Sequence, residues 1–377
     1  MSAQLSSAKP RRRGVHTLVA LGSIVLLLAI LATWIRAQVL DTNGWTQTSV
    51  RLLSNAQVRS ALAGGLSERL LDAVDVEGVA AEELPPKLAK LAPALSAATA
   101  AALPRAVDRT LALPAVQTLW AHANRRAHER VLELLEGGGS VLSTSRGVVE
   151  IDLEELLSRV GRRVGVGSEA GAKLPPSRRQ IVLLKSRQLR LAQDAVKALR
   201  DLSFILPLLA ALLYLGALLL GRGARRQALL EIGIGVFFTA LLSLLLRRWI
   251  ESYVVDGLIV NEANRPAVGA IIEIATSGWR DRALWLLVTG LLVVCAAWLA
   301  GPMRAAVWLR AAIAGPLERH PAWFLCGAAG IVLLVALLGP GRTPGQAIPL
   351  AIELALAIAG VLALRRQVID ERRTPNE

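Results

Sequence analysis

The chain has 377 residues, of which 54% are hydrophobic, and a formal net charge of +14. Its apolar residues gather in blocks of membrane-span length, which excludes an ordinary soluble protein. The basic surplus lies mostly in short segments beside these blocks. This distribution is typical of membrane topology and excludes a basic face that binds nucleic acid.

The first apolar block predicts a transmembrane anchor helix over residues 15–36. A helix of this length reaches about 30 Å, which is the thickness of one bilayer core. Residues 1–14 are polar and basic, and we interpret them as a cytoplasmic N-terminal tail. No small-residue cleavage site follows, because Trp34, Ile35 and Arg36 occupy that position, so we expect the anchor to stay attached.

Residues 37–200 contain no apolar run of span length, and they predict a mostly helical extracytoplasmic domain. Apolar residues at four-residue steps predict a helix over 55–74 with Asn55 as its cap, and prolines predict short helices or bends over 78–104. A stronger helix is predicted from Pro114 to Glu136. The apolar stripe of this helix, which we expect to face the core, consists of Val116, Leu119, Trp120, Ala123, Ala127, Val131 and Leu134.

A small β element is predicted next, either a hairpin or a three-stranded sheet. Strands over 141–144 and 148–151 flank a Ser-Arg-Gly turn, and residues 180–184 predict a third strand. The domain then ends in a helix over 187–201 that carries Leu189, Val196 and Leu199 on one face. No proline or glycine separates this helix from the second apolar block, so we predict that it relays changes between the domain and the membrane.

Five further apolar blocks predict a five-helix transmembrane region over residues 201–366, followed by a cytoplasmic C-terminal tail over 367–377. The blocks cover 202–221, 228–246, 283–301, 322–339 and 347–364. The fold class is therefore a mainly α, multi-pass protein with about six transmembrane helices. We expect the protein to lie in the cytoplasmic membrane of a bacterium. The distribution of basic segments predicts that both termini are cytoplasmic. The outer loop 249–282 carries apolar residues and is predicted to dock on the extracytoplasmic domain.

The sequence contains no recognisable catalytic or metal-binding motif, so it predicts no catalytic, cofactor or metal site. His128 and Glu129 begin a zinc-protease pattern, but Leu132 stands where the second histidine belongs, so we expect His128 to lie on the polar face of its helix. Phosphate-loop, nucleophile-elbow and paired-cysteine motifs are missing as well. Cys295 and Cys326 fall in apolar blocks, where thiols act as small apolar residues.

Two acids lie inside apolar blocks. Glu353 is the candidate intramembrane functional acid, because a buried carboxyl in a span suggests proton or ion handling. Helix packing or pairing at the interface is the alternative. Glu231 is predicted to reach the interface or the neighbouring Arg225 and Arg226.

Several short segments resemble a family of uncharacterised integral membrane proteins of actinobacteria. The resemblance implies the same order of anchor, external domain and multi-span bundle, and it carries no established activity. The segments are Val39-Leu40-Asp41-Thr42, Asn124-Arg125 with His128, Gly147-Val148-Val149 to Ile151-Asp152-Leu153, Leu174-Pro175 before Ile181, and Gly301-Pro302.

Three functions compete. The first is a non-enzymatic envelope protein whose residues 37–200 bind an envelope protein, a lipid or a wall component, with its state relayed to the bundle. The second is a transporter or transport accessory subunit that uses the bundle around Glu353. The third, a membrane enzyme, has no nucleophile, base or metal set to support it.

Overall fold

The computed structural model describes residues 8–73, 92–136, 142–143, 148–152, 180–185, 187–221, 224–258 and 262–309, with the single residues 327 and 330. The chain forms two compact units. Unit 1 comprises Met1–Trp34, Leu202–Ile250 and Thr276–Glu377, and unit 2 comprises Ile35–Asp201 and Glu251–Ala275.

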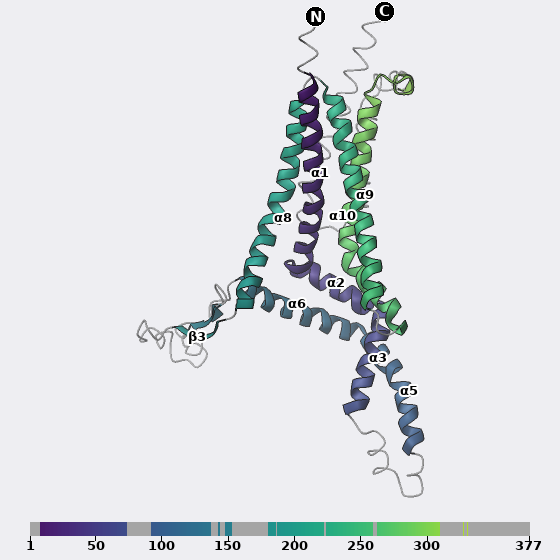
Figure 1. Ribbon diagram of the computed structural model, residues 1–377. Coiled ribbons are helices and arrows are strands. Elements are labelled where there is room, and N and C mark those ends of the chain that lie inside the picture. Colours follow the sequence, from purple (N-terminus) through teal and green to yellow (C-terminus); the bar gives the residue numbers. More distant parts are fainter. Residues whose placement is uncertain are drawn as a thin grey trace, which may run out of the picture. The chain divides into compact units, whose positions relative to one another are not determined.

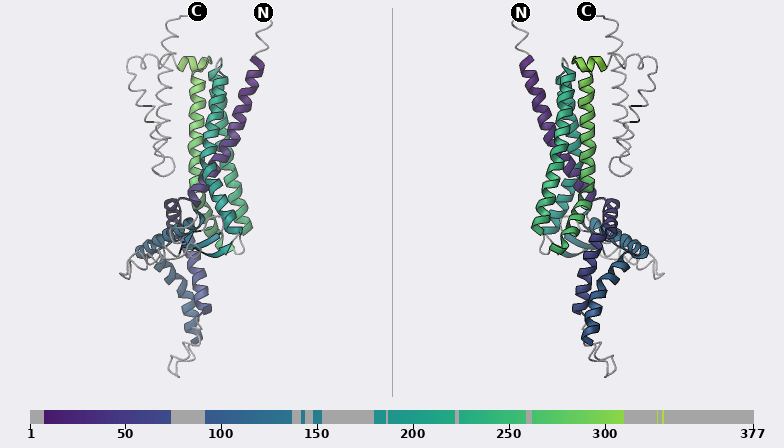
Figure 2. Two further views of the ribbon diagram at one scale, coloured as in Figure 1. Left: turned by 90° about the vertical axis from the view of Figure 1, so that its left-hand side faces the viewer. Right: turned by 90° about the vertical axis from the view of Figure 1, so that its right-hand side faces the viewer.

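Long apolar helices build unit 1. They are α1 (Ala8–Val39), α8 (Arg187–Leu220), α9 (Arg225–Leu258) and α10 (Arg265–Leu299), and their unit 1 portions run side by side (Figures 1 and 2). These four described helices are long and apolar enough to cross a membrane, which indicates an integral, multi-pass membrane protein. They coincide with the first four apolar blocks. The predicted fifth and sixth spans and the C-terminal tail lie outside the described residues.

These helices extend beyond the apolar blocks. The α9 helix has 34 residues and α10 has 35, so each reaches about 50 Å, well beyond a bilayer core of about 30 Å. The prediction of an irregular loop over 249–282 is therefore wrong. The 3-10 helix η5 (Glu262–Asn264) directly precedes α10.

Small residues set the helix packing in unit 1. Val15 and Val19 of α1 pack on Ala217 of α8 and Ala228 of α9. Nearer the other end of α1, Ile30 packs on Trp279 and Ala283 of α10. Close approach of α9 and α10 requires glycine: a Cβ at Gly290 would lie 2.7 Å from the backbone nitrogen of Phe237, and one at Gly233 would lie 2.9 Å from that of Val294. Gly233 and Gly290 thus let the two helices pack closely.

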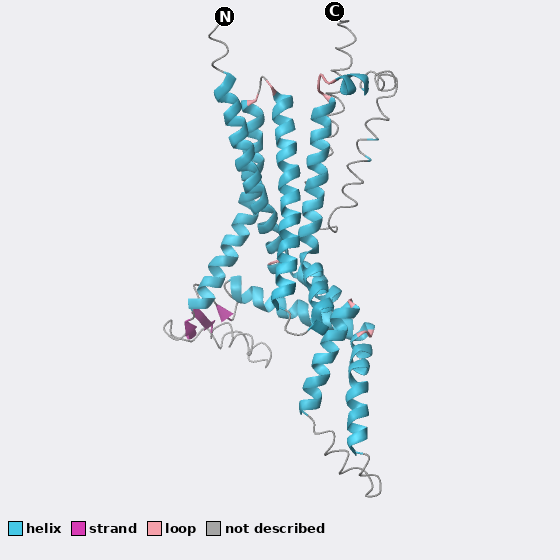
Figure 3. Cartoon of the chain, turned by 45° about the vertical axis from the view of Figure 1, so that its right-hand side comes forward, coloured by secondary structure: helices cyan, strands magenta, loops and turns pink. Residues whose placement is uncertain are grey.

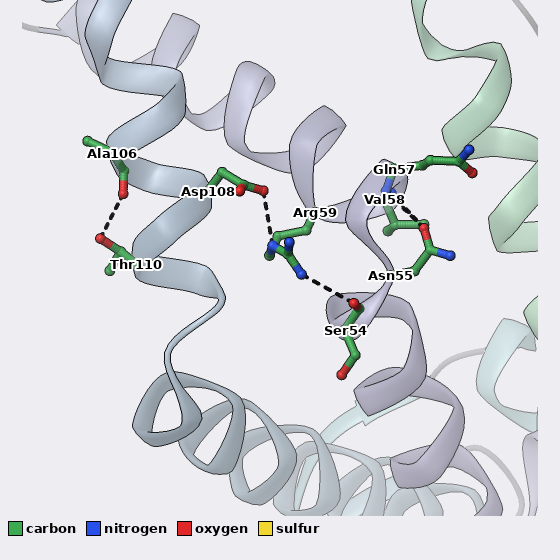
Figure 4. A network of polar contacts seen from close by, with 8 residues as sticks. All are labelled: Ser54, Asn55, Gln57, Val58, Arg59, Ala106, Asp108 and Thr110. Carbon is green, nitrogen blue, oxygen red and sulfur yellow. Dashed lines mark hydrogen bonds and ion pairs between the residues drawn. The ribbon is translucent and has the colours of Figure 1, made fainter.

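Unit 2 contains the helices α2 (Thr42–Ser54), α3 (Ala56–Ala73), α5 (Ala92–Leu111) and α6 (Pro114–Glu136). Asn55 separates α2 from α3, and its side-chain oxygen accepts hydrogen bonds from the backbone nitrogens of Gln57 and Val58 (Figure 4). The predicted cap is thus confirmed. The α3 helix packs on α5, where Nε of Arg59 lies 3.0 Å from Oδ1 of Asp108 (Figure 4). The α5 helix continues through Pro104, so the predicted break there is wrong.

Three short strands follow α6. They are β1 (Leu142–Ser143), β2 (Val148–Asp152) and β3 (Gln180–Lys185), and they pair antiparallel in the order β1-β2-β3 (Figure 3). In the β2–β3 pair the register shifts between Val149 and Glu150. The strands lie where the sequence predicts a hairpin and a third strand.

The predicted core face of α6 is wrong. Leu119 is 69% exposed, Val131 is 50% exposed and Trp120 is 39% exposed, whereas His128 on another face is buried. The reason lies in α2, whose buried residues are Thr46, Thr48, Ser49 and Leu53. Because α2 presents mainly hydroxyl groups to its neighbour, α6 packs on it through a polar face and leaves its apolar stripe outside. Nε1 of Trp120 donates to the backbone oxygen of Ser49 on α2 at 3.2 Å.

Candidate functional site

A polar stripe runs along α9 through the interior of unit 1. Glu231, Gly235, Thr239, Ser243 and Arg247 are spaced four residues apart and therefore share one face of the helix. Thr239, Ser243 and Arg247 are buried. Polar groups inside a span need partners within the protein, because the hydrocarbon offers none. The stripe is the strongest concentration of buried polar groups in the described part of unit 1.

Each member of the stripe meets a neighbouring helix. The hydroxyl of Ser243 accepts a hydrogen bond of 2.7 Å from Nε1 of Trp279. Nε of Arg247 donates to the hydroxyl of Thr276 at 2.9 Å. Both partners lie on α10, so this half of the stripe holds α9 to α10. Trp279 also contacts Trp34 of α1, with ring centroids 5.2 Å apart.

The middle of the stripe faces α1. Thr239 donates to the backbone oxygen of Ser23 at 3.5 Å, and the hydroxyl of Ser23 lies 3.2 Å from that of Tyr214 on α8. A Cβ at Gly235 would lie 2.8 Å from the same Ser23 hydroxyl, so glycine is needed there. Ser23 therefore links three helices of unit 1 at one level.

Charged groups stand at both ends of the stripe. Oε2 of Glu231 lies 3.0 Å from Nδ1 of His16, a pair that is ionic only when His16 is protonated. That oxygen is buried and accepts no aligned hydrogen bond within the described residues, so the contact is electrostatic rather than a hydrogen bond. Of the two predicted alternatives, pairing of Glu231 with Arg225 and Arg226 is wrong, because Glu231 contacts His16, and its reach to the membrane interface stays a prediction. Glu231 and Arg247 are about 24 Å apart along α9.

This stripe was not predicted from the sequence. Its sequence signal is a four-residue period of small and polar residues within an otherwise apolar block, and the mean hydropathy of a span-length window does not reveal such a period. Glu353, the acid singled out from the sequence, lies outside the described residues. In the described part of the chain no group of three or more His, Cys, Asp and Glu side chains is placed to hold a metal ion.

The predicted relay residues lie on α8. Val196 is buried and Leu189 and Leu199 are half-buried. The helix continues without interruption through Pro207 to Leu220. The same stretch of α8 contacts the end of α6, where Nε2 of Gln193 donates to the backbone oxygen of Leu134 at 3.1 Å and Arg200 pairs with Glu136.

A second polar cluster surrounds His128 in unit 2. Nε2 of His128 lies 3.1 Å from the backbone oxygen of Val39, and Nδ1 lies 3.1 Å from the hydroxyl of Thr42. Because a carbonyl oxygen only accepts, Nε2 carries a proton, and in the neutral ring Nδ1 accepts from Thr42. The ring also stacks on Trp45, with centroids 5.1 Å apart. His128 lies on a polar face of α6, as predicted, but this face is buried against α2.

The cluster joins two of the segments that carry the resemblance. Val39 to Thr42 comes from one segment and His128 from the other. Next to them, Arg125 donates to the side-chain oxygen of Asn43 at 2.8 Å. These contacts attach the middle of α6 to the turn between α1 and α2, and they explain why the polar residues of α6 face inward.

Replacing His128 by alanine is expected to loosen the α2–α6 contact. The change leaves the Val39 carbonyl and the Thr42 hydroxyl without this partner, at a cost of about 1–3 kcal/mol for a buried polar group. Hydrogen exchange of the full-length protein in nanodiscs should show faster exchange of amides in α2 and α6. His122→Ala, on an exposed position of the same helix, is the control. Equal protection in both variants would contradict the assignment.

A groove of about 630 Å³ lies within unit 2 between α3 and the start of α10. Its α3 wall consists of small and polar residues, including Ala61, Gly64 and Gly65, and its other wall includes Asn264 and Pro266. A Cβ at Gly64 or Gly65 would meet no atom within 4 Å. The groove is therefore open enough to admit another chain.

One wall of the groove belongs to the outer loop 249–282, which was predicted to dock on the extracytoplasmic domain. Residues 251–275 cluster with the domain, and Nε2 of Gln38 donates to the backbone oxygen of Ala275 at 2.7 Å. Docking of this segment is thus confirmed. The contact is polar, however, and Ile271, one of the predicted apolar docking residues, is 40% exposed.

Comparison with models of known protein families, with curated proteins and with solved structures found no match.

Proposed function

We propose that this chain is a non-enzymatic protein of the bacterial cell envelope, anchored by its spans, whose unit 2 binds an extracytoplasmic partner. In this proposal both termini lie in the cytoplasm and residues 37–200 lie outside, as the distribution of basic residues favours. The open groove beside α3 is the observation that carries the proposal. The layout of anchor, domain and bundle agrees with the proposed likeness to the actinobacterial family.

The chemistry of the groove favours a polypeptide segment of an envelope protein. Alanine, serine and glycine on its α3 wall let a backbone approach closely, as small residues do at helix contacts. Gln57, Glu68 and Asn264 supply side chains that form hydrogen bonds at its margins. A partner segment with a small-residue face and a basic or amide group near Glu68 fits this wall.

A photocrosslinking amino acid at Ala61 of the full-length protein, in native membranes, tests the proposal. We expect one crosslinked adduct between this protein and its partner. The adduct should form only when the groove is open to the partner. Gly64→Trp fills that space without a clash at Cβ, and it should abolish the adduct. Gly269→Trp is the matched control, because Gly269 is equally open but does not line the groove.

The proposal fails if no adduct forms at Ala61, or if the adduct survives Gly64→Trp as well as it survives Gly269→Trp. Melting of both variants in nanodiscs establishes that each remains folded. Equal loss of the adduct in both tryptophan variants also contradicts the proposal. Gly269→Trp does not fill the groove, so the loss would then have another cause.

A transporter or transport accessory subunit is the second candidate. The α9 stripe favours it, because charged groups at both ends of a row of buried hydroxyls are a feature of ion and proton pathways. The alternative is a structural role, in which the polar groups stabilise helix packing. The direct hydrogen bonds of Ser243 and Arg247 to α10 support this structural role. We therefore rank binding above transport.

A further inference from the structure

The α6 helix has three faces of different character. One face, which includes His128, packs on α2. A second face carries the charged residues Arg126, Glu129, Arg130 and Glu133, among which Arg130 and Glu133 form an exposed ion pair of 2.8 Å. The third face is the apolar stripe, formed by Leu119, Trp120, Ala123, Ala127, Val131 and Leu134, and it is exposed. An apolar face of this extent on a helix that also has a charged face is typical of helices that lie in a membrane interface.

Hydrogen bonds hold α6 close to the points where two spans leave the membrane. In its middle, His128 bonds the backbone oxygen of Val39, only three residues after the predicted anchor ends at Arg36. At its end, Leu134 and Glu136 contact Gln193 and Arg200 of α8, just before the second apolar block begins at Leu202. Val39 and Arg200 thus each lie within three residues of a predicted span, and their partners on α6, His128 and Glu136, are about 12 Å apart along that helix.

These contacts keep α6 within a few residues of two predicted spans. We take the bilayer that the spans cross as the occupant of its exposed stripe. A tryptophan at one end of the stripe suits this environment, because indole rings concentrate at the level of the lipid headgroups. The charged face, with Arg126 and Arg130, can then turn to water and to lipid phosphates.

We propose that α6 is an interfacial helix whose exposed apolar stripe lies against the lipid at the headgroup–acyl boundary of the bilayer that the spans cross. Such helices bury their apolar face about 5–10 Å into this boundary. This role differs from partner binding in the groove, since the groove is lined by α3 and the start of α10 and by none of the α6 residues.

Spin labels on neighbouring residues of α6 provide the test. Full-length protein carrying Cys295→Ser and Cys326→Ser is labelled at single cysteines and reconstituted in nanodiscs of phosphatidylethanolamine and phosphatidylglycerol. The pairs Ala127 with Arg126, and Val131 with Glu129, each compare a stripe position with a nearby charged position on another face. All four positions are exposed, so the label does not enter the core.

We expect the labels at Ala127 and Val131 to collide several-fold more with oxygen, relative to a water-soluble nickel chelate, than those at Arg126 and Glu129. Preferential collision with the nickel chelate at the stripe positions would show that the stripe faces water. Low collision with both reagents there would show that protein covers it, either a second copy or another part of the chain. Either of these results would overturn the proposal.

Discussion

Replacing Gly290 by alanine is expected to destabilise unit 1 by about 1–3 kcal/mol, the usual cost of overpacking a close contact. The added Cβ would lie 2.7 Å from the backbone nitrogen of Phe237 and 3.1 Å from the backbone oxygen of Gly233. Neither atom can rotate away, so α9 and α10 must separate. Thermal melting of the full-length protein in nanodiscs measures the effect.

Gly216→Ala supplies the control for this measurement. Its added Cβ would lie 3.7 Å from Cδ1 of Leu18, which is an ordinary contact. Alanine also favours a helix over glycine by about 1 kcal/mol, so this variant should melt at or above the wild-type temperature. If Gly290→Ala melted no lower than Gly216→Ala, the close crossing of α9 and α10 would be refuted.

Removal of the Trp279 side chain is the second change with a large expected effect. Trp279 is only 2% exposed, contacts Trp34 and donates its indole hydrogen to Ser243. Trp279→Ala should cost about 3–5 kcal/mol, the range for large buried aromatic side chains. The same melting experiment in nanodiscs should show a large loss of thermal stability.

Two further variants separate packing from hydrogen bonding. Trp279→Phe retains much of the ring volume but not the donor to Ser243, and it should cost less than Trp279→Ala. Trp249→Ala removes an indole that is 62% exposed, and we expect a much smaller change. A similar loss from Trp249→Ala and Trp279→Ala would mean that burial in unit 1 does not explain the stability.

The sequence was sufficient for features that depend on local rules. The spans are recognisable because about 20 consecutive apolar residues are needed to cross a bilayer, whatever they pack against. Asn55 as a cap and Pro114 as the first residue of α6 follow from the backbone requirements of a helix start. Each of these features concerns one stretch of chain and does not depend on a distant partner.

Features that depend on a distant partner were not predictable. The buried face of α6 is set by the threonines and serines of α2, and a rule that assumes an apolar core selects the opposite set of residues, including Trp120. Likewise, Glu231 pairs with His16, more than two hundred residues earlier in the chain. The α9 stripe was at least visible as a four-residue period, although only the structure shows which helices it meets.

The α9 stripe has a consequence for the order in which the chain assembles during synthesis. Ser23, which accepts from Thr239, precedes it by 216 residues and is already in place when α9 emerges. Thr276 and Trp279, the partners of Arg247 and Ser243, follow them by 29 and 36 residues and do not yet exist. A lone α9 would leave the hydroxyl of Ser243 in hydrocarbon and the guanidinium of Arg247 at the border of the span without these partners. Insertion of α9 together with α10 would supply both partners at once.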